Sequence, residues 1–72
     1  MKKDTRLIKL GERVASIRES KGLTKYALAK KMGKPYQSIL RIETGRINAT
    51  YLYLDDVAKA FDMDLVEMLK GL

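Results

Sequence analysis

The sequence predicts an all-α fold in which five helices form a single compact domain over residues 1–72. Three observations favour this fold. Apolar residues recur at three- and four-residue spacing along most of the chain, as the buried faces of helices require. No stretch shows the alternation or the tight turns of a β-hairpin. Because 72 residues bury only one small core, the chain has no room for a second domain.

The first predicted helix begins near Leu7 and ends at Gly22, a residue type that favours helix C-termini. Charged residues such as Arg13 and Glu19 lie off its apolar stripe. The stripe consists of Leu7, Leu10, Val14 and Ile17. This pattern is typical of an amphipathic helix that covers a core with one face.

The next two helices form a helix-turn-helix over about residues 24–45. Thr24 offers a hydroxyl N-cap to residues 25–32, and Gly33 closes that helix. Pro35 suits the first turn of the following helix, which runs to about Thr44, because no backbone amide is needed there. The residues expected to face the core are Leu28, Ala29, Met32, Ile39 and Ile42.

Residues 50–70 are expected to form the two C-terminal helices, which pack on the body or on a second copy of the chain. Thr50 can cap the fourth helix and Asp64 the short fifth one. The apolar face of the fourth helix is Tyr51, Leu54, Val57, Ala58 and Phe61. We therefore expect Tyr51 to be buried and Tyr53, which is off this face, to be exposed.

The composition disfavours several classes of protein. The chain has no histidine and no cysteine, which removes the commonest zinc ligands, the usual general base and any thiol nucleophile. Its carboxylates lack the spacing of a calcium loop. We therefore predict no enzyme, no metal and no cofactor. No apolar run approaches the roughly 18 residues of a membrane span. No apolar stretch follows residues 1–4, so we expect no signal peptide and a cytoplasmic protein.

Charge is distributed unevenly along the chain. Residues 1–48 carry 13 Lys and Arg against 4 Asp and Glu, whereas residues 49–72 carry 2 against 5. A basic first part indicates a face that meets a polyanion such as nucleic acid. The alternative is a basic surface that is only solvated. Lys2, Lys3 and Arg6 form either a basic arm or a frayed terminus.

The spacing within residues 24–43 has a steric explanation. Two helices that cross steeply over a short turn bring their backbones close, which favours the small Ala29 and a glycine, Gly33, in the turn. Ile39 and Ile42 then face inward. The opposite face, near the start of the second helix, carries Tyr36, Gln37, Ser38 and Arg41. This is the end that a recognition helix places in the major groove.

These features resemble the phage-repressor and Cro-like (Xre-type) helix-turn-helix family over residues 10–69. The resemblance rests on several short motifs at fixed spacing. They are Leu10-Gly11-Glu12-Arg13, Ile17-Arg18, Lys21-Gly22-Leu23-Thr24, Leu28-Ala29, Gly33, Ile39, Arg41-Ile42-Glu43, Gly45, Leu54, Val57-Ala58-Lys59-Ala60-Phe61, Leu65 and Glu67. The resemblance implies a five-helix, lambda-repressor-like DNA-binding domain.

The resemblance also implies roles for matched positions. Gln37 and Arg41 fall where family members contact bases, in accord with glutamine pairing with adenine and arginine with guanine. Tyr36 lies on the same face and can reach either a thymine methyl or a phosphate. The phosphate contacts implied are Lys25, Ser38 and Arg46. Arg18 and Glu43 match a structural ion pair of the family.

Three residues depart from the family pattern. Pro35 stands where a hydroxyl N-cap is usual, so that cap is lost. Asp62 replaces a turn glycine, and aspartate tolerates the left-handed conformation better than most residues. Leu40 is apolar where a polar residue is common, which leaves either an unexpected core contact or an exposed patch.

The sequence thus predicts a sequence-specific regulator, a transcriptional repressor that binds double-stranded DNA. The helix from about Pro35 to Thr44 enters the major groove of a palindromic operator, read by a homodimer. The expected dimer interface is Met63, Leu65, Val66, Leu69 and Leu72. The alternative is an antitoxin that holds a toxin, or another protein-interaction module that retains the fold.

Overall fold

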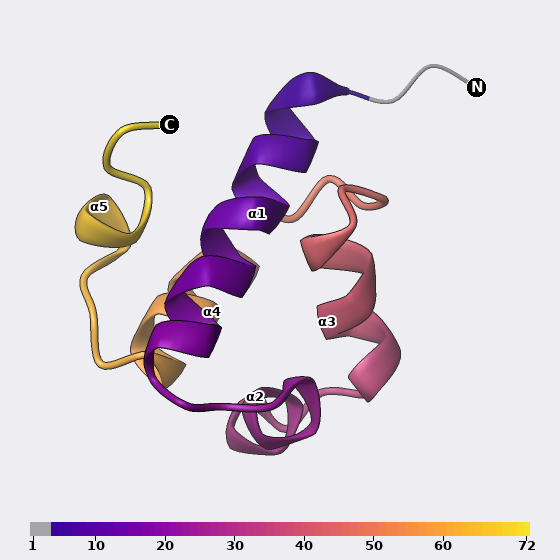
Figure 1. Cartoon of the computed structure of the whole chain (residues 1–72), viewed down its shortest axis with the longest axis vertical. Helices are drawn as coiled ribbons and strands as arrows, with labels where there is room; N and C mark the ends of the chain where they lie inside the picture. The colour runs from indigo at the N-terminus through magenta and orange to yellow at the C-terminus, as the bar shows by residue number, and fades with distance from the viewer. Residues whose placement is uncertain (1–3) are drawn as a thin grey trace.

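The computed structural model describes residues 4–72, and every regular element within that range is an α-helix. The all-α, five-helix prediction is therefore confirmed. The helices are α1 (Thr5–Ser20), α2 (Lys25–Met32), α3 (Tyr36–Glu43), α4 (Tyr51–Ala60) and α5 (Leu65–Met68), as Figure 1 shows. Lys2 and Lys3, considered as part of a basic arm, lie outside the described residues.

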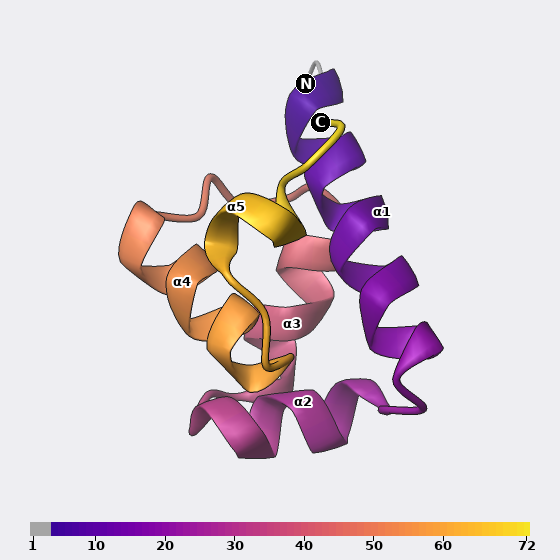
Figure 2. The ribbon, with the colours of Figure 1, turned by 90° about the vertical axis from the view of Figure 1, so that its left-hand side faces the viewer.

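The helices surround one core. In Figure 1, α1 crosses in front of α4, with α3 on one side, α5 on the other and α2 below them. Turning the molecule by 90° brings α5 to the front and leaves α3 behind it (Figure 2), so α3 and α5 lie on opposite sides. α3 packs against α1 and α2, whereas α4 packs against α2 and α5. The helix-turn-helix, α2 and α3, therefore keeps one face of α3 away from the C-terminal helices.

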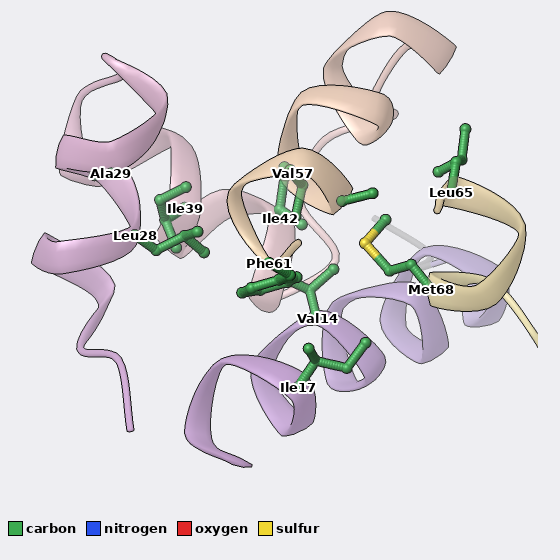
Figure 3. Packing of buried hydrophobic residues seen from close by; sticks show 11 residues of the cluster. Val14, Ile17, Leu28, Ala29, Ile39, Ile42, Val57, Phe61, Leu65 and Met68 are labelled. Carbon is green, nitrogen blue, oxygen red and sulfur yellow. The ribbon is translucent and has the colours of Figure 1, made fainter. Parts of the chain in front are cut away.

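The core draws side chains from all five helices. Phe61, Leu28, Val57 and Met68 are at most 1% exposed. Figure 3 shows Met68 reaching from α5 toward Phe61 and Val14, which closes the side of the core between α1 and α4. Arg13 of α1 donates from Nε to the backbone carbonyl of Met68 at 2.9 Å, which holds the short helix in place. Packing on the body therefore stabilises α5, as a helix of its length requires.

Two of the four predicted helix starts have the expected side-chain cap, and two do not. The hydroxyls of Thr24 and Thr50 each accept a hydrogen bond from the backbone amide three residues later, at 3.0 and 3.2 Å. Pro35 is the N-cap of α3 rather than its first helical residue, and it has no side-chain cap bond. Asp64 occupies the N-cap of α5, but its side chain makes no cap bond.

The expectation for the two tyrosines of α4 is wrong. Tyr51 is 70% exposed because it is the first residue of the helix, beyond the packed part. Tyr53 packs against the core instead, since it lies one helical turn before Val57 and shares its direction. The Nζ atom of Lys34 lies 5.4 Å from the Tyr53 ring centroid. The buried Tyr53 hydroxyl has no hydrogen-bond partner among residues 4–72.

Candidate nucleic-acid interface

The third helix has one face in the core and one in solvent. Ile39 and Ile42 are 1% and 2% exposed, whereas Gln37 and Arg41 on the opposite side are exposed. This division follows from the helical repeat, because residues four apart share a face. α3 is thus an amphipathic helix whose polar face is open to a ligand.

A glycine lets α1 approach the end of α3 closely. Gly11 is buried, and a Cβ atom built on it would lie 2.6 Å from the backbone oxygen of Glu43 and also against that of Ile42. No larger residue fits there without a shift of the backbone. Gly11 belongs to the Leu10-Gly11-Glu12-Arg13 motif, but the motif alone assigns it no role. The contact that explains it joins residues far apart in the chain.

A buried ion pair fixes the same end of α3. The guanidinium of Arg18 donates from Nε to Glu43 Oε2 at 2.7 Å and from Nη2 to Oε1 at 3.1 Å. The two side chains are 9% and 5% exposed. Arg18 also donates from Nη1 to the Leu23 carbonyl at 2.8 Å. The hydrogen bonds to Glu43 raise the pKa of Arg18 above its ordinary value. The structure thus brings together the two residues that the resemblance paired.

The turn between α2 and α3 is closed by glycine and by a pair of stacked rings. Gly33 has a φ of +65°, and the following amide, of Lys34, donates to the Ala29 carbonyl at 3.0 Å. The rings of Tyr26 and Tyr36 stack with centroids 4.2 Å apart and planes inclined by 19°. The stack holds Tyr36 at the start of α3, where Pro35 provides no side-chain cap. Sequence reasoning missed Tyr26, since only the turn brings the rings together.

A hollow of about 570 Å³ opens beside the polar face of α3. It collects three of the residues predicted to bind DNA: Gln37, Arg41 and Arg46. Its other lining residues are Leu40, Thr44 and Ile47. Leu40 is half-buried, so it is neither a full core residue nor a fully exposed patch. Two of the three predicted base contacts, Gln37 and Arg41, and one predicted phosphate contact, Arg46, therefore share one concave surface.

The other predicted DNA contacts lie outside the hollow. Tyr36 is half-buried in its stack on Tyr26. Lys25 is the first residue of α2, and Ser38 lies in the first turn of α3; both are half-buried. The predicted contacts thus extend from the start of α2, along α3, to the loop that follows it.

The charges of this surface are available to an anion. Within residues 4–72, neither Arg41 nor Arg46 forms an ion pair with a carboxylate. The acidic residues of the second half lie in or next to α4 and α5, where Asp55 pairs with Lys59 at 3.1 Å. The charge asymmetry of the sequence therefore separates cations beside α3 from acids around α4 and α5.

Metal binding and membrane insertion have no candidate residues in the part of the chain that the structure describes. No group of three or more His, Cys, Asp or Glu side chains within residues 4–72 could hold a metal ion. None of the described helices is both long and apolar enough to cross a membrane. The exposed polar face of α3 and the hollow beside it make this surface the candidate functional site.

The five residues predicted to form a dimer interface differ in exposure. Val66 and Leu72 are 82% and 56% exposed, and Met63 and Leu69 are half-buried. Leu65 is only 9% exposed because it packs in the core of its own chain. It therefore offers little surface to a partner.

Two helices joined by a tight turn, with an exposed polar face on the second, define a DNA-binding helix-turn-helix domain. A helix-turn-helix family model matches residues 14–68. The chain belongs to the Xre-type helix-turn-helix family and has the fold of its DNA-binding transcription regulators. No curated protein matches the chain.

Solved structures support this assignment. The chain is similar to the restriction-modification controller protein C.AhdI from Aeromonas hydrophila, with 27% identity over 92% of this chain and 100% of that one, and a TM-score of 0.88. The controller protein C.Esp1396I is 30% identical over 88% of this chain and 85% of that one, with a TM-score of 0.78. SinR, a master regulator of biofilm formation solved with DNA, is 26% identical over 85% and 98%, with a TM-score of 0.77.

Proposed function

We propose that this protein is a sequence-specific transcriptional repressor that inserts α3 into the major groove of a palindromic operator. The observation that carries the proposal is the outer face of α3. Gln37 and Arg41 are exposed there one helical turn apart, while Gly11 and the Arg18–Glu43 pair fix the inner side of the same helix. These inner contacts fix the orientation of α3, so its outer side chains face the DNA in one arrangement. A role on DNA also agrees with the expected cytoplasmic location.

The spacing of the two reading residues matches that of base pairs. Four residues of α-helix rise about 6 Å, close to two steps of about 3.4 Å along a DNA strand. Glutamine can pair bidentately with adenine and arginine with guanine. We therefore infer that Gln37 and Arg41 read an adenine and a guanine about two base pairs apart, with Tyr36 at the edge of the same site.

Contacts to the DNA backbone are expected on both sides of α3. Lys25 stands at the N-terminus of α2, where the helix dipole and backbone amides already favour a phosphate. Ser38 and Arg46 provide a hydroxyl and a guanidinium along α3 and in the loop after it. Such contacts fix the register of a protein on DNA without reading its sequence.

A homodimer would supply the two-fold symmetry of a palindrome. Half-sites one helical turn apart are about 34 Å from centre to centre, and the principal extents of the chain are 31 × 25 × 22 Å, so two copies fit side by side. The exposed Val66 and Leu72 favour an interface around α5, on the side opposite α3. Sedimentation that shows only monomer at high micromolar concentration, with and without DNA, would exclude the dimer.

A protein-binding role is the second candidate. One similar structure is that of a complex between the SinR protein and the SinI protein. The matched chain of that complex is 25% identical to this chain. An antitoxin or other interaction module would retain the α3 surface but bind DNA weakly or not at all. Salt dependence separates the two roles, because a protein that neutralises phosphates loses DNA affinity steeply as salt rises.

The decisive experiment is selection of bound sequences from a random duplex pool. We expect a two-fold symmetric consensus with half-sites about 10 base pairs apart. Arg41→Ala should relax the preference at one base position, whereas Lys25→Ala should weaken all sequences alike and reduce the salt slope by about 1. Lys70→Ala, an exposed lysine after α5, is the matched control and should change neither. Failure to enrich any sequence would refute sequence-specific reading.

Repression needs a separate test. Transcription in vitro from a promoter that overlaps the selected operator should fall as the protein is added. Arg41→Ala should relieve this inhibition at equal concentration. An increase in transcription would instead show an activator.

A further inference from the structure

We propose that the hollow beside α3 receives the 5-methyl group of a pyrimidine in the major groove, and that Leu40 determines specificity there. The inference rests on the proposed function, since it assumes that α3 enters the groove. It assigns a role to the one residue of the α3 surface that departs from the polar pattern. The ligand is defined by its chemistry, a methyl group at C5 of a pyrimidine, which thymine and 5-methylcytosine share.

The geometry of the hollow places Leu40 beside the reading residues. Leu40 lies three residues after Gln37 and directly before Arg41, and both of them line the same hollow. Residues three apart on a helix are neighbours on its surface. A base edge that approaches Gln37 is therefore within reach of the exposed part of Leu40.

The lining of the hollow combines an apolar surface with cations. Leu40 and Ile47 provide the apolar part. Both are half-buried, and Ile47 packs against the core while it lines the hollow. Arg41 and Arg46 are exposed in the same lining. This arrangement suits an anionic ligand with a small apolar group. A free apolar ligand would form no ion pair or hydrogen bond with the two guanidinium groups.

The major groove offers only one apolar group to such a surface. Its base edges are hydrogen-bond donors and acceptors except at the C5 position of pyrimidines, where thymine carries a methyl group. A leucine opposite a bare polar edge would leave that edge without a partner and displace its water. A leucine opposite a methyl removes both from water, which is worth about a three- to fivefold gain in affinity.

The test uses duplexes that differ by one methyl group. Starting from the selected operator, each thymine is replaced in turn by deoxyuridine, which keeps the pairing with adenine. At one position in each half-site, wild-type protein should bind the uracil duplex about three- to fivefold more weakly than the thymine duplex. Leu40→Ala should bind the thymine and uracil duplexes equally at that position. Leu52→Ala, which shortens an exposed apolar residue on α4 outside the proposed DNA and dimer surfaces, is the matched control and should keep the difference.

A second set of duplexes separates the two sources of the methyl group. A cytosine–guanine pair is placed at the same position, with and without a 5-methyl group on the cytosine. If the protein contacts the methyl group itself, methylation of the cytosine should raise the affinity of wild type about three- to fivefold. It should leave the affinity of Leu40→Ala unchanged. An effect of thymine alone would restrict the site to thymine.

The outcomes separate this inference from the proposed function. Selective, salt-dependent binding with no thymine–uracil difference at any position would overturn the role of Leu40 alone. An equal thymine–uracil difference in wild type and Leu40→Ala would also overturn it, because another side chain would then contact the methyl. Absence of selective DNA binding by the wild type would refute the proposed function and this inference with it. Urea unfolding of Leu40→Ala verifies that the variant is folded.

Discussion

Breaking the ion pair between Arg18 and Glu43 is expected to destabilise the protein strongly. Three proteins test this: Glu43→Gln, Arg18→Met and the double variant. Glu43→Gln keeps the shape of the side chain and leaves the guanidinium without its counter-charge. Arg18→Met leaves the carboxylate without its donors and also removes the bond to the Leu23 carbonyl. The double variant leaves no buried charge unpaired.

The burial of the pair gives the magnitude. The side chains are 9% and 5% exposed, and loss of one partner of a buried pair costs about 3–5 kcal/mol. A chain of 72 residues has a total stability on the order of 4 to 11 kcal/mol. Each single variant should therefore lose a large fraction of the free energy of unfolding. The double variant should lose clearly less than the two single losses added together, because neither charge is then stranded.

Urea unfolding of the wild type and the three variants measures these free energies. Glu19→Gln is the control, because Glu19 lies 3.8 Å from the same guanidinium but its side chain is 71% exposed. It should cost less than about 1 kcal/mol. Two results would refute the reasoning. One is a single-variant cost for Glu43→Gln as small as that of Glu19→Gln, and the other is a double variant whose loss equals the sum of the single losses.

Three other changes test contacts around α3 and at the start of α1. Gly11→Ala should lower the free energy of unfolding in urea by about 1–3 kcal/mol, because its Cβ meets backbone oxygens of α3; an open helix position would give the opposite sign. Tyr26→Ala should reduce operator affinity about two- to tenfold in an anisotropy titration, by releasing Tyr36, while Tyr26→Phe should preserve it; equal affinities would contradict this. Hydrogen bonds from Arg6 lower the pKa of Asp4 below its ordinary 3.8. The ionised Asp4 carboxylate therefore contributes to stability above pH 3.8, and this contribution is lost as the pH falls through the lowered pKa. A carbon-detected NMR titration should show this midpoint move back toward 3.8 in Arg6→Ala.

The elements of the fold were predictable because local signals agree with the final packing. Thr24 and Thr50 provide the caps that the sequence indicates, and Gly33 takes the left-handed conformation of the turn. Asp62 does the same with a φ of 56°, as its residue type allows. In each case the cause lies within a few residues of its effect, so a single sequence is enough to reveal it.

What sequence reasoning missed depends on contacts between distant segments. Tyr51 fits the apolar spacing of α4 but lies at its exposed first turn, and spacing cannot show where a neighbouring helix stops. Leu65, predicted at a dimer interface, is only 9% exposed, because it packs with the fully buried Met68 in the core of its own chain. The stack between Tyr26 and Tyr36 and the close approach at Gly11 likewise require the crossing of two helices. Of the candidate site, the residues could be named from the sequence, whereas the hollow that collects some of them could not.

The two sides of α3 are under different physical constraints. The inner side is fixed by Ile39 and Ile42, by the glycine contact with α1 and by the buried ion pair, so changes there cost stability. Gln37 and Arg41 on the outer side are exposed, and their replacement leaves these contacts intact. Leu40 belongs to both sides, because it is half-buried and also lines the hollow. Because a half-buried leucine has fewer accessible rotamers than a long, fully exposed side chain, a contact that it makes with a ligand has a better defined geometry.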